Sequence, residues 1–160
     1  MSDWIDKAVD EIRKQDECRA FYLLRTRIIL SQFPLFWDDL EWCIRQELRT
    51  FNNRRDVVDW WGTFSGYGKS EENRKLLVVE NTKFPRIRLT VIREYTSVAA
   101  EWLYTDTPSS ETDRRSEHFH TKFNGIGELS GDICLQSGIL LLNPSRAADH
   151  ILAKMFQRNW

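Results

Sequence analysis

The segment EHFHTKFN, residues 117–124, places His118, His120 and Lys122 at alternate positions. Side chains two residues apart in a strand lie on one face, so a strand here would present two imidazoles and an ammonium group together. Imidazoles titrate near neutral pH and can act as general acids or bases. The same alternation is also typical of the solvated face of an ordinary antiparallel strand.

A second basic pair precedes this segment in RIRLTVIRE, residues 86–94, where Arg86 and Arg88 alternate with apolar residues. If the apolar sides of both strands face a core, their polar sides share one open face. Guanidinium groups can hold a phosphate or carboxylate through two parallel hydrogen bonds. The two strands therefore predict a basic sheet face that could bind an anion, or a face that is only solvated.

A metal site would use the same histidines. His118 and His120 could point at one cation, with Glu117, Glu101 or His150 completing its ligands. Protein metal sites usually need three or four ligands, and no further ligands follow at a recognisable spacing. We therefore expect no metal.

The glycine-rich segment NGIGELSGD, residues 124–132, lacks both the G-x-G-x-x-G and the Gly-Lys-Ser/Thr patterns that cradle phosphates. Asn124-Gly125 is instead typical of a hairpin turn. G-x-S-x-G and H-E-x-x-H are also missing from the sequence. We expect no cofactor.

Trp60 and Trp61 stand next to each other in DWWGTF, residues 59–64. In the irregular strand that this segment suggests, they would point to opposite sides, leaving one of them exposed. An exposed tryptophan beside an apolar cleft suits a ligand pocket or a partner interface. Alternatively, both pack at a covered sheet edge.

Composition limits the classes of partner. The 160 residues carry 23 basic and 24 acidic side chains, and this balance gives no long-range attraction to nucleic acid or anionic lipid. The longest apolar run, GILLL at 138–142, is far shorter than the ~20 residues of a membrane span. An acidic, helical N-terminus and three cysteines without C-x-x-C spacing favour a cytoplasmic protein with reduced thiols. The cysteines are Cys18, Cys43 and Cys134.

Periodicity predicts the fold. Apolar residues at helical spacing run from Trp4 to Ile28, Pro34 predicts the end of that helix, and a second helix carries an apolar side from Trp37 to Phe51. Strand patterns follow from residue 76 to residue 142, with a polar loop at 106–115. Asn143 and Pro144 suit the start of a last helix.

We therefore expect one α+β domain, residues 1–160. It would have an N-terminal helical hairpin, an antiparallel sheet of five or six strands and a C-terminal helix, with the helices on one sheet face. The predicted function is a soluble intracellular binding module for an anionic small molecule or a protein partner. Its binding residues would be Arg86, Arg88, His118, His120, Lys122, Trp60 and Trp61.

Two alternatives remain. The first is a small enzyme with His118 or His120 as general acid/base and the two arginines as substrate anchors. The second is a single-stranded nucleic-acid binder, supported by four arginines near the end of the second helix and opposed by the pI of about 6.3. These arginines are Arg45, Arg49, Arg54 and Arg55.

Overall fold

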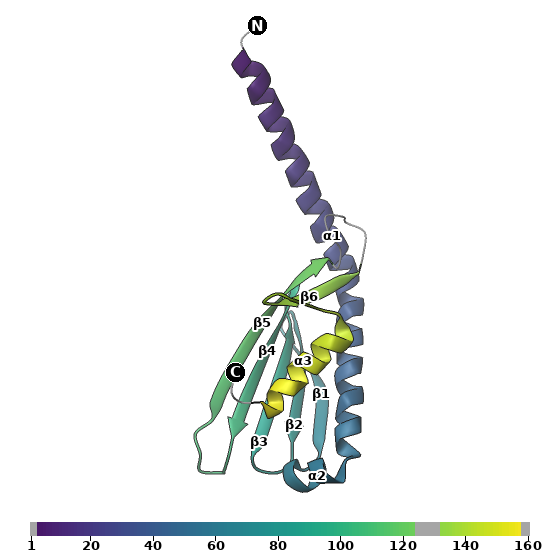
Figure 1. Cartoon of the computed structure of the whole chain (residues 1–160), viewed down its shortest axis with the longest axis vertical. Coiled ribbons are helices and arrows are strands. Elements are labelled where there is room, and N and C mark those ends of the chain that lie inside the picture. The colour runs from purple at the N-terminus through teal and green to yellow at the C-terminus, as the bar shows by residue number, and fades with distance from the viewer. Residues whose placement is uncertain (1–2, 124–131, 158–160) are drawn as a thin grey trace.

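A computed structural model of the chain describes residues 3–123 and 132–157 (Figure 1). Three helices occupy Asp3–Asn52 (α1), Arg55–Trp61 (α2) and Pro144–Phe156 (α3). The strands are Phe64–Glu71 (β1), Arg74–Asn81 (β2), Arg86–Arg93 (β3), Ser97–Thr105 (β4), Asp113–Phe123 (β5), Ile133–Ser137 (β6) and Leu140–Leu142 (β7). The expected hairpin turn at Asn124-Gly125 lies outside the described residues.

The strands form one antiparallel sheet in the order β1-β2-β3-β4-β5-β6-β7. The α+β class and the antiparallel sheet are confirmed, but the described residues form seven strands where five or six were expected. Residues 69–75 form a tight hairpin, because Glu71 pairs with Arg74 and only two residues form the turn. The predicted loop at 106–115 is shorter, since β5 already begins at Asp113.

The expected helical hairpin is wrong, because α1 continues through Pro34 as one helix of 50 residues. A proline inside a helix removes one backbone hydrogen bond and costs about 3 kcal/mol. Phe33, Phe36 and Trp37 surround this position and are all buried. Burial of each such side chain contributes roughly 2 kcal/mol, so packing outweighs the local penalty.

The strand expected at Trp60 and Trp61 is also wrong, because both residues lie in the short helix α2. The Trp61 ring packs edge-on against Phe156 with 5.5 Å between ring centroids. The buried Asn81 amide donates a hydrogen bond to the Trp61 carbonyl oxygen at 2.8 Å. Gly62, at φ 74°, ends the helix where a side chain would collide with Thr82. These tertiary contacts outweigh the strand preference of the aromatic pair.

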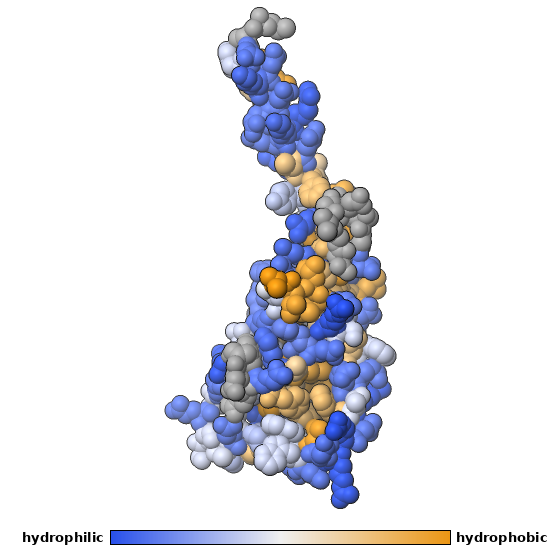
Figure 2. Space-filling view, in the orientation of Figure 1, coloured by the Kyte–Doolittle hydropathy of each residue, from blue (hydrophilic) through white to orange (hydrophobic). Residues whose placement is uncertain are grey.

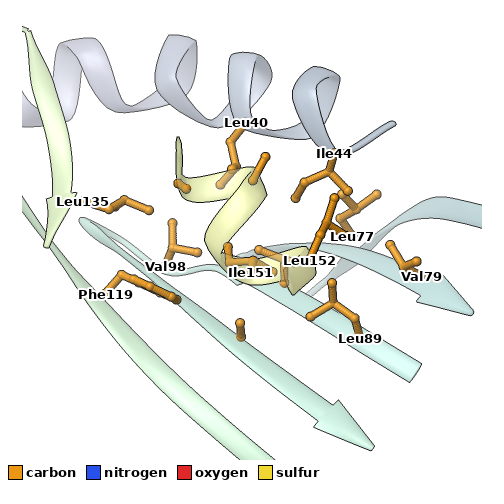
Figure 3. Close-up of a cluster of buried hydrophobic side chains, with 14 of the residues drawn as sticks. Leu40, Ile44, Leu77, Val79, Leu89, Val98, Phe119, Leu135, Ile151 and Leu152 are labelled. Atoms are coloured by element: carbon orange, nitrogen blue, oxygen red, sulfur yellow. The ribbon is translucent and has the colours of Figure 1, made fainter. Parts of the chain in front are cut away.

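The hydrophobic core lies between one face of the sheet and the helices α1 and α3. Figure 3 shows Leu40 and Ile44 of α1 above Ile151 and Leu152 of α3, with the sheet beneath them. Side chains alternate between buried and more exposed along β4, as the period of a strand requires. The sheet residues labelled in the same view are Leu77, Val79, Leu89, Val98, Phe119 and Leu135.

The last helix follows the sequence prediction closely. The Asn143 side chain accepts a hydrogen bond from the Arg146 backbone N–H at 2.9 Å, and Pro144 occupies the first turn. Trp102 Nε1 donates to the Ile151 carbonyl oxygen at 3.1 Å, and Tyr104 Oη donates to that of Lys154 at 2.5 Å. Both bonds fix α3 across β4.

The N-terminal half of α1 touches the sheet only near its last turn, where Arg25 stacks on the Phe123 ring of β5. The first buried residue of this helix is Ile29, and the preceding turns project beyond the strands (Figure 1). We call residues 3–28 the arm. The expectation that every amphipathic helix covers the sheet is therefore wrong for this segment. Within the described residues, no helix is long and apolar enough to cross a bilayer.

Candidate functional site

The five basic residues singled out in the sequence all lie exposed on the outer face of the sheet, opposite the helices. Alternation along β3 and β5 puts the buried residues Ile87, Leu89 and Phe119 on the other side. The outer face carries Arg86, Arg88, His118, His120 and Lys122. The predicted sharing of one face is thus seen in the structure.

The arginine and histidine pairs nevertheless lie toward different ends of that face. Arg88 pairs with Leu103 of β4, whereas His118 pairs with Ala99 of the same strand. Four residues of strand correspond to about 13 Å, and β3 and β5 lie about 10 Å apart on either side of β4. One small anion cannot bridge both pairs, so they form two separate surfaces.

At the arginine end, Arg88 Nε lies 2.6 Å from Glu80 Oε1, so this guanidinium already has a carboxylate partner. The Arg86 guanidinium stacks over the Phe84 ring at 5.1 Å. Both arginines line a hollow of about 200 Å³ together with Leu103. Pockets that hold small molecules usually measure about 300–1,000 Å³. This end is a small hollow whose arginines already have partners within the chain.

At the histidine end, the rings of His118 and His120 lie 5.0 Å apart, and His118 Nε2 is 3.8 Å from Glu94 Oε2. Glu117, which the sequence suggested as a further metal ligand, points to the opposite side of β5 and binds His150 there. Across residues 3–123 and 132–157, no three His, Cys, Asp or Glu side chains are grouped to hold a metal ion.

His120 also borders a hollow of about 360 Å³ where α1 leaves the sheet. Tyr22 and Arg25 of the arm and Tyr95 of the β3–β4 turn line the same hollow. The Arg25 guanidinium stacks on the Phe123 ring at 6.0 Å. This hollow brings a guanidinium, an imidazole and two tyrosines together, which sequence spacing did not reveal.

Charged residues also meet on the inner side of β5, where Glu117 joins Ser137, His150 and Lys154. Ser137 Oγ donates to Glu117 Oε1 at 2.5 Å, and His150 Nε2 lies 3.2 Å from Oε2, which also accepts from Lys154 Nζ. Burial acts to raise the pKa of Glu117, but the hydrogen bonds from Lys154, Ser137 and His150 outweigh it and hold the pKa below its ordinary value.

This cluster is not a nucleophilic triad, although it contains a serine, a histidine and a carboxylate. Ser137 Oγ and Glu117 both approach the same ring nitrogen of His150, Nε2. In a triad the hydroxyl and the carboxylate bind different ring nitrogens. The cluster instead links α3 to β5 and β6. Two sequence signals were available: Glu117 shares the strand parity of buried Phe119, and His150 and Lys154 are one helical turn apart.

The two adjacent tryptophans do not form a cleft together. Trp61 is partly buried against Phe156, whereas Trp60 is 66% exposed on the outer side of α2. The expectation that one of the pair is exposed is confirmed. Their ring centroids are 6.5 Å apart, in an edge-on arrangement.

The arm presents apolar side chains to solvent in two places. The first, which we call the apolar stripe, lies on one side near the tip and consists of Trp4, Ile5, Val9 and Ile12. The second, the apolar ring, lies near the foot and consists of Phe21, Tyr22, Leu23 and Leu24. Successive helical residues are rotated by about 100°, so four in a row face every side of the helix.

These side chains are well exposed, with Trp4 at 69% and Leu23 at 66%. Figure 2 shows apolar atoms at the foot of the arm, below its largely hydrophilic outer turns. A helix that is apolar all round is normally buried in a protein interior or an interface. Another exposed apolar side chain lies off the arm: Ile139, in the turn between β6 and β7, is 97% exposed.

The chain matches no family model, no curated protein and no solved structure in the comparisons made.

Proposed function

We propose that this protein is a protein-interaction module whose arm is the binding element. The observation that carries the proposal is the apolar stripe and apolar ring on a helix that projects beyond the sheet. Most helical stability in proteins comes from tertiary packing, and the arm has no buried residue. A binding partner would supply the packing that the rest of the described chain, which we call the body, does not.

The chemistry of the arm supports recognition of another protein. Trp and Tyr dominate the energetic centres of protein interfaces, and the arm exposes Trp4 and Tyr22. Ile5, Val9 and Ile12 of the stripe are spaced by about one helical turn, as in helices that bind along an apolar surface. By contrast, the hollow at Arg86 and Arg88 is small, and Arg88 already contacts Glu80.

The test is the native size of the protein in an extract of its own cells, measured by size-exclusion chromatography. Wild type should elute in an assembly larger than its 19.1 kDa, and Trp4→Asp should shift it toward the monomer. Trp60→Asp is the matched control, because Trp60 is as exposed as Trp4 but lies off the arm. A wild type that elutes only as a monomer would contradict the proposal.

A second candidate function is binding of a small anion in the hollow lined by Arg25 and His120. The observation in its favour is that its volume, about 360 Å³, falls in the range of ligand pockets. Inorganic phosphate should then raise the melting temperature of wild type but not of Arg25→Ala or His120→Ala. Equal shifts in all three proteins, or none in wild type, would exclude this site.

A further inference from the structure

We infer that the partner of the arm is the arm of a second copy of this chain, lying antiparallel to it. This inference rests on the proposed function and names its partner. Three features of the arm carry it: the distribution of charge along it, the distribution of its apolar residues, and the position of the body at one end only.

The charges of the arm are separated along its length. Residues 3–11 contain four acidic side chains and one lysine, a net charge of −3. Residues 12–18 contain two basic and two acidic side chains and are neutral, and residues 19–28 contain three arginines and no acid, a net charge of +3. The acidic residues are Asp3, Asp6, Asp10 and Glu11, and the arginines are Arg19, Arg25 and Arg27.

We call residues 3–11 the tip of the arm and residues 19–28 its foot. An antiparallel pair places the acidic tip of each arm beside the basic foot of the other. Opposite charges then face each other at both ends, and the neutral middle segments meet at the centre. A parallel pair would place −3 beside −3 and +3 beside +3. Like charges across an interface are destabilising, so the charge pattern selects the antiparallel arrangement.

The apolar residues follow the same division. The apolar stripe lies in the acidic tip, the apolar ring lies in the basic foot, and residues 13–19 between them are polar apart from one cysteine. Antiparallel pairing brings the stripe of one arm to the ring of the other, twice in each pair. The ring has apolar side chains on every side of its helix. The stripe of one arm therefore contacts apolar atoms of the other arm, however that other helix is rotated about its own axis.

The shape of the chain leaves room for this arrangement. An arm of 26 residues is about 39 Å long at 1.5 Å per residue. The body follows only the foot, so an antiparallel pair holds the two bodies at opposite ends. The arm matches a lipid surface less well, because its net charge is zero and its tip is acidic, whereas helices that lie on anionic membranes are basic on their polar side.

The experiment is sedimentation equilibrium of the purified full-length chain over a range of concentrations. Wild type should form a dimer of twice 19.1 kDa. Asp6→Lys/Asp10→Lys should weaken the dimer at least tenfold, because the tip becomes positive beside a positive foot. Arg19→Glu/Arg27→Glu should weaken the dimer by a similar factor, because the foot becomes negative and lies beside a negative tip. These four residues are exposed, so the body should keep its melting temperature.

Mixing the two variants in equal amounts should restore the dimer, since each altered tip then faces an altered foot of opposite sign. Asp38→Lys/Asp59→Lys is the matched control, because it makes the same charge change at exposed positions off the arm. This control should dimerise like wild type. A parallel pair predicts that Asp6→Lys/Asp10→Lys tightens the dimer, since it reduces repulsion between two tips, and that result would overturn the antiparallel arrangement.

A purified wild type that stays monomeric at all concentrations would overturn the inference. If the same protein is part of an assembly in the extract, the arm binds a different protein and the proposed function stands. A monomer in both experiments would overturn both. A purified dimer that the charge variants do not change would place the contact elsewhere and overturn the pairing of the arms.

Discussion

Glu117 is a carboxylate on the core-facing side of β5, where it accepts hydrogen bonds from β6 and α3. Its side chain is only 17% exposed, as is that of Lys154. Breaking a buried ion pair by removing one partner costs about 3–5 kcal/mol, more than an exposed pair contributes. Removing the charge of this residue should therefore affect stability more than removing a charge from an exposed ion pair.

Glu117→Gln should lower the free energy of unfolding at neutral pH by about 3 kcal/mol, because Lys154 and His150 lose their carboxylate partner. The pKa of Glu117 is lower in the folded chain than in the unfolded chain, so folding favours the ionised form. Its stabilising effect is complete above the unfolded pKa of about 4.3 and is lost as pH falls through the folded pKa.

The melting temperatures of wild type and Glu117→Gln should thus differ by a constant amount above about pH 5 and converge below about pH 4. Glu101→Gln is the matched control, because Glu101 lies on the outer side of the adjacent strand, 3.8 Å from Arg114. Its effect should stay within about 0.5 kcal/mol. A constant difference down to pH 3 would contradict the role given to the Glu117 charge.

Arg88→Ala should change the free energy of unfolding by less than about 1 kcal/mol, because exposed ion pairs contribute little. Arg88 is 56% exposed in its side chain, and its partner Glu80 is 33% exposed. Urea denaturation of both proteins measures the difference. A loss above about 2 kcal/mol would mean that this guanidinium is part of a larger structural network.

At the scale of elements, α3 closes the core through one side of the helix. Ala148 and Ile151 have no exposed surface, whereas Ala153 on the same helix is exposed. Asn143 caps the start of the helix, and Pro144 lies in its first turn. Hydrogen bonds from the Trp102 and Tyr104 side chains hold the helix across the sheet. A charge on the inner side would need to be buried among apolar residues.

Ala148→Asp and Ile151→Asp should each destabilise the chain by at least about 3 kcal/mol, because an isolated carboxylate is strongly disfavoured in an apolar environment. Thermal unfolding followed by circular dichroism measures this. Ala153→Asp carries the same new charge on the exposed side and should cost less than about 1 kcal/mol. Melting of Ala148→Asp near the wild-type temperature would show that α3 does not cover the core in this way.

At the scale of the whole molecule, α1 has two halves with different surroundings. Its C-terminal half is buried from Ile29 to Leu48 along one side, whereas the arm has no buried residue. Helical segments without tertiary contacts open with little free energy, and packed ones open only with the core. One continuous helix should therefore show two levels of stability.

Hydrogen exchange should be fast for arm amides in dilute protein and slow for amides between Trp37 and Leu48. Raising the protein concentration should slow exchange in the arm alone, if the arms pair. Mass spectrometry of peptides from both halves measures this. Equal protection along the whole helix at every concentration would contradict an arm that is free in the monomer.

Sequence patterns determined the local features of this protein. Strand alternation predicted that Arg86, Arg88 and the histidines share one face of the sheet. The capping residue Asn143 predicted where α3 begins. Helical spacing of apolar residues in the sequence also predicted the apolar sides of the helices. These features depend on residues within a few positions of each other, so short-range periodicity and capping chemistry are sufficient to predict them.

Features that depend on distant residues follow from tertiary packing and could not be predicted from local patterns. Packing around Phe33, Phe36 and Trp37 carries α1 through Pro34, and contacts with Asn81 and Phe156 make α2 a helix. Strand register separates the arginines from the histidines, and α3 supplies the partners of Glu117. The sequence shows that the arm has an apolar side. Whether that side is buried depends on what lies near it in space, and periodicity does not contain this information. In the structure the arm extends past the end of the sheet, so its apolar side stays exposed.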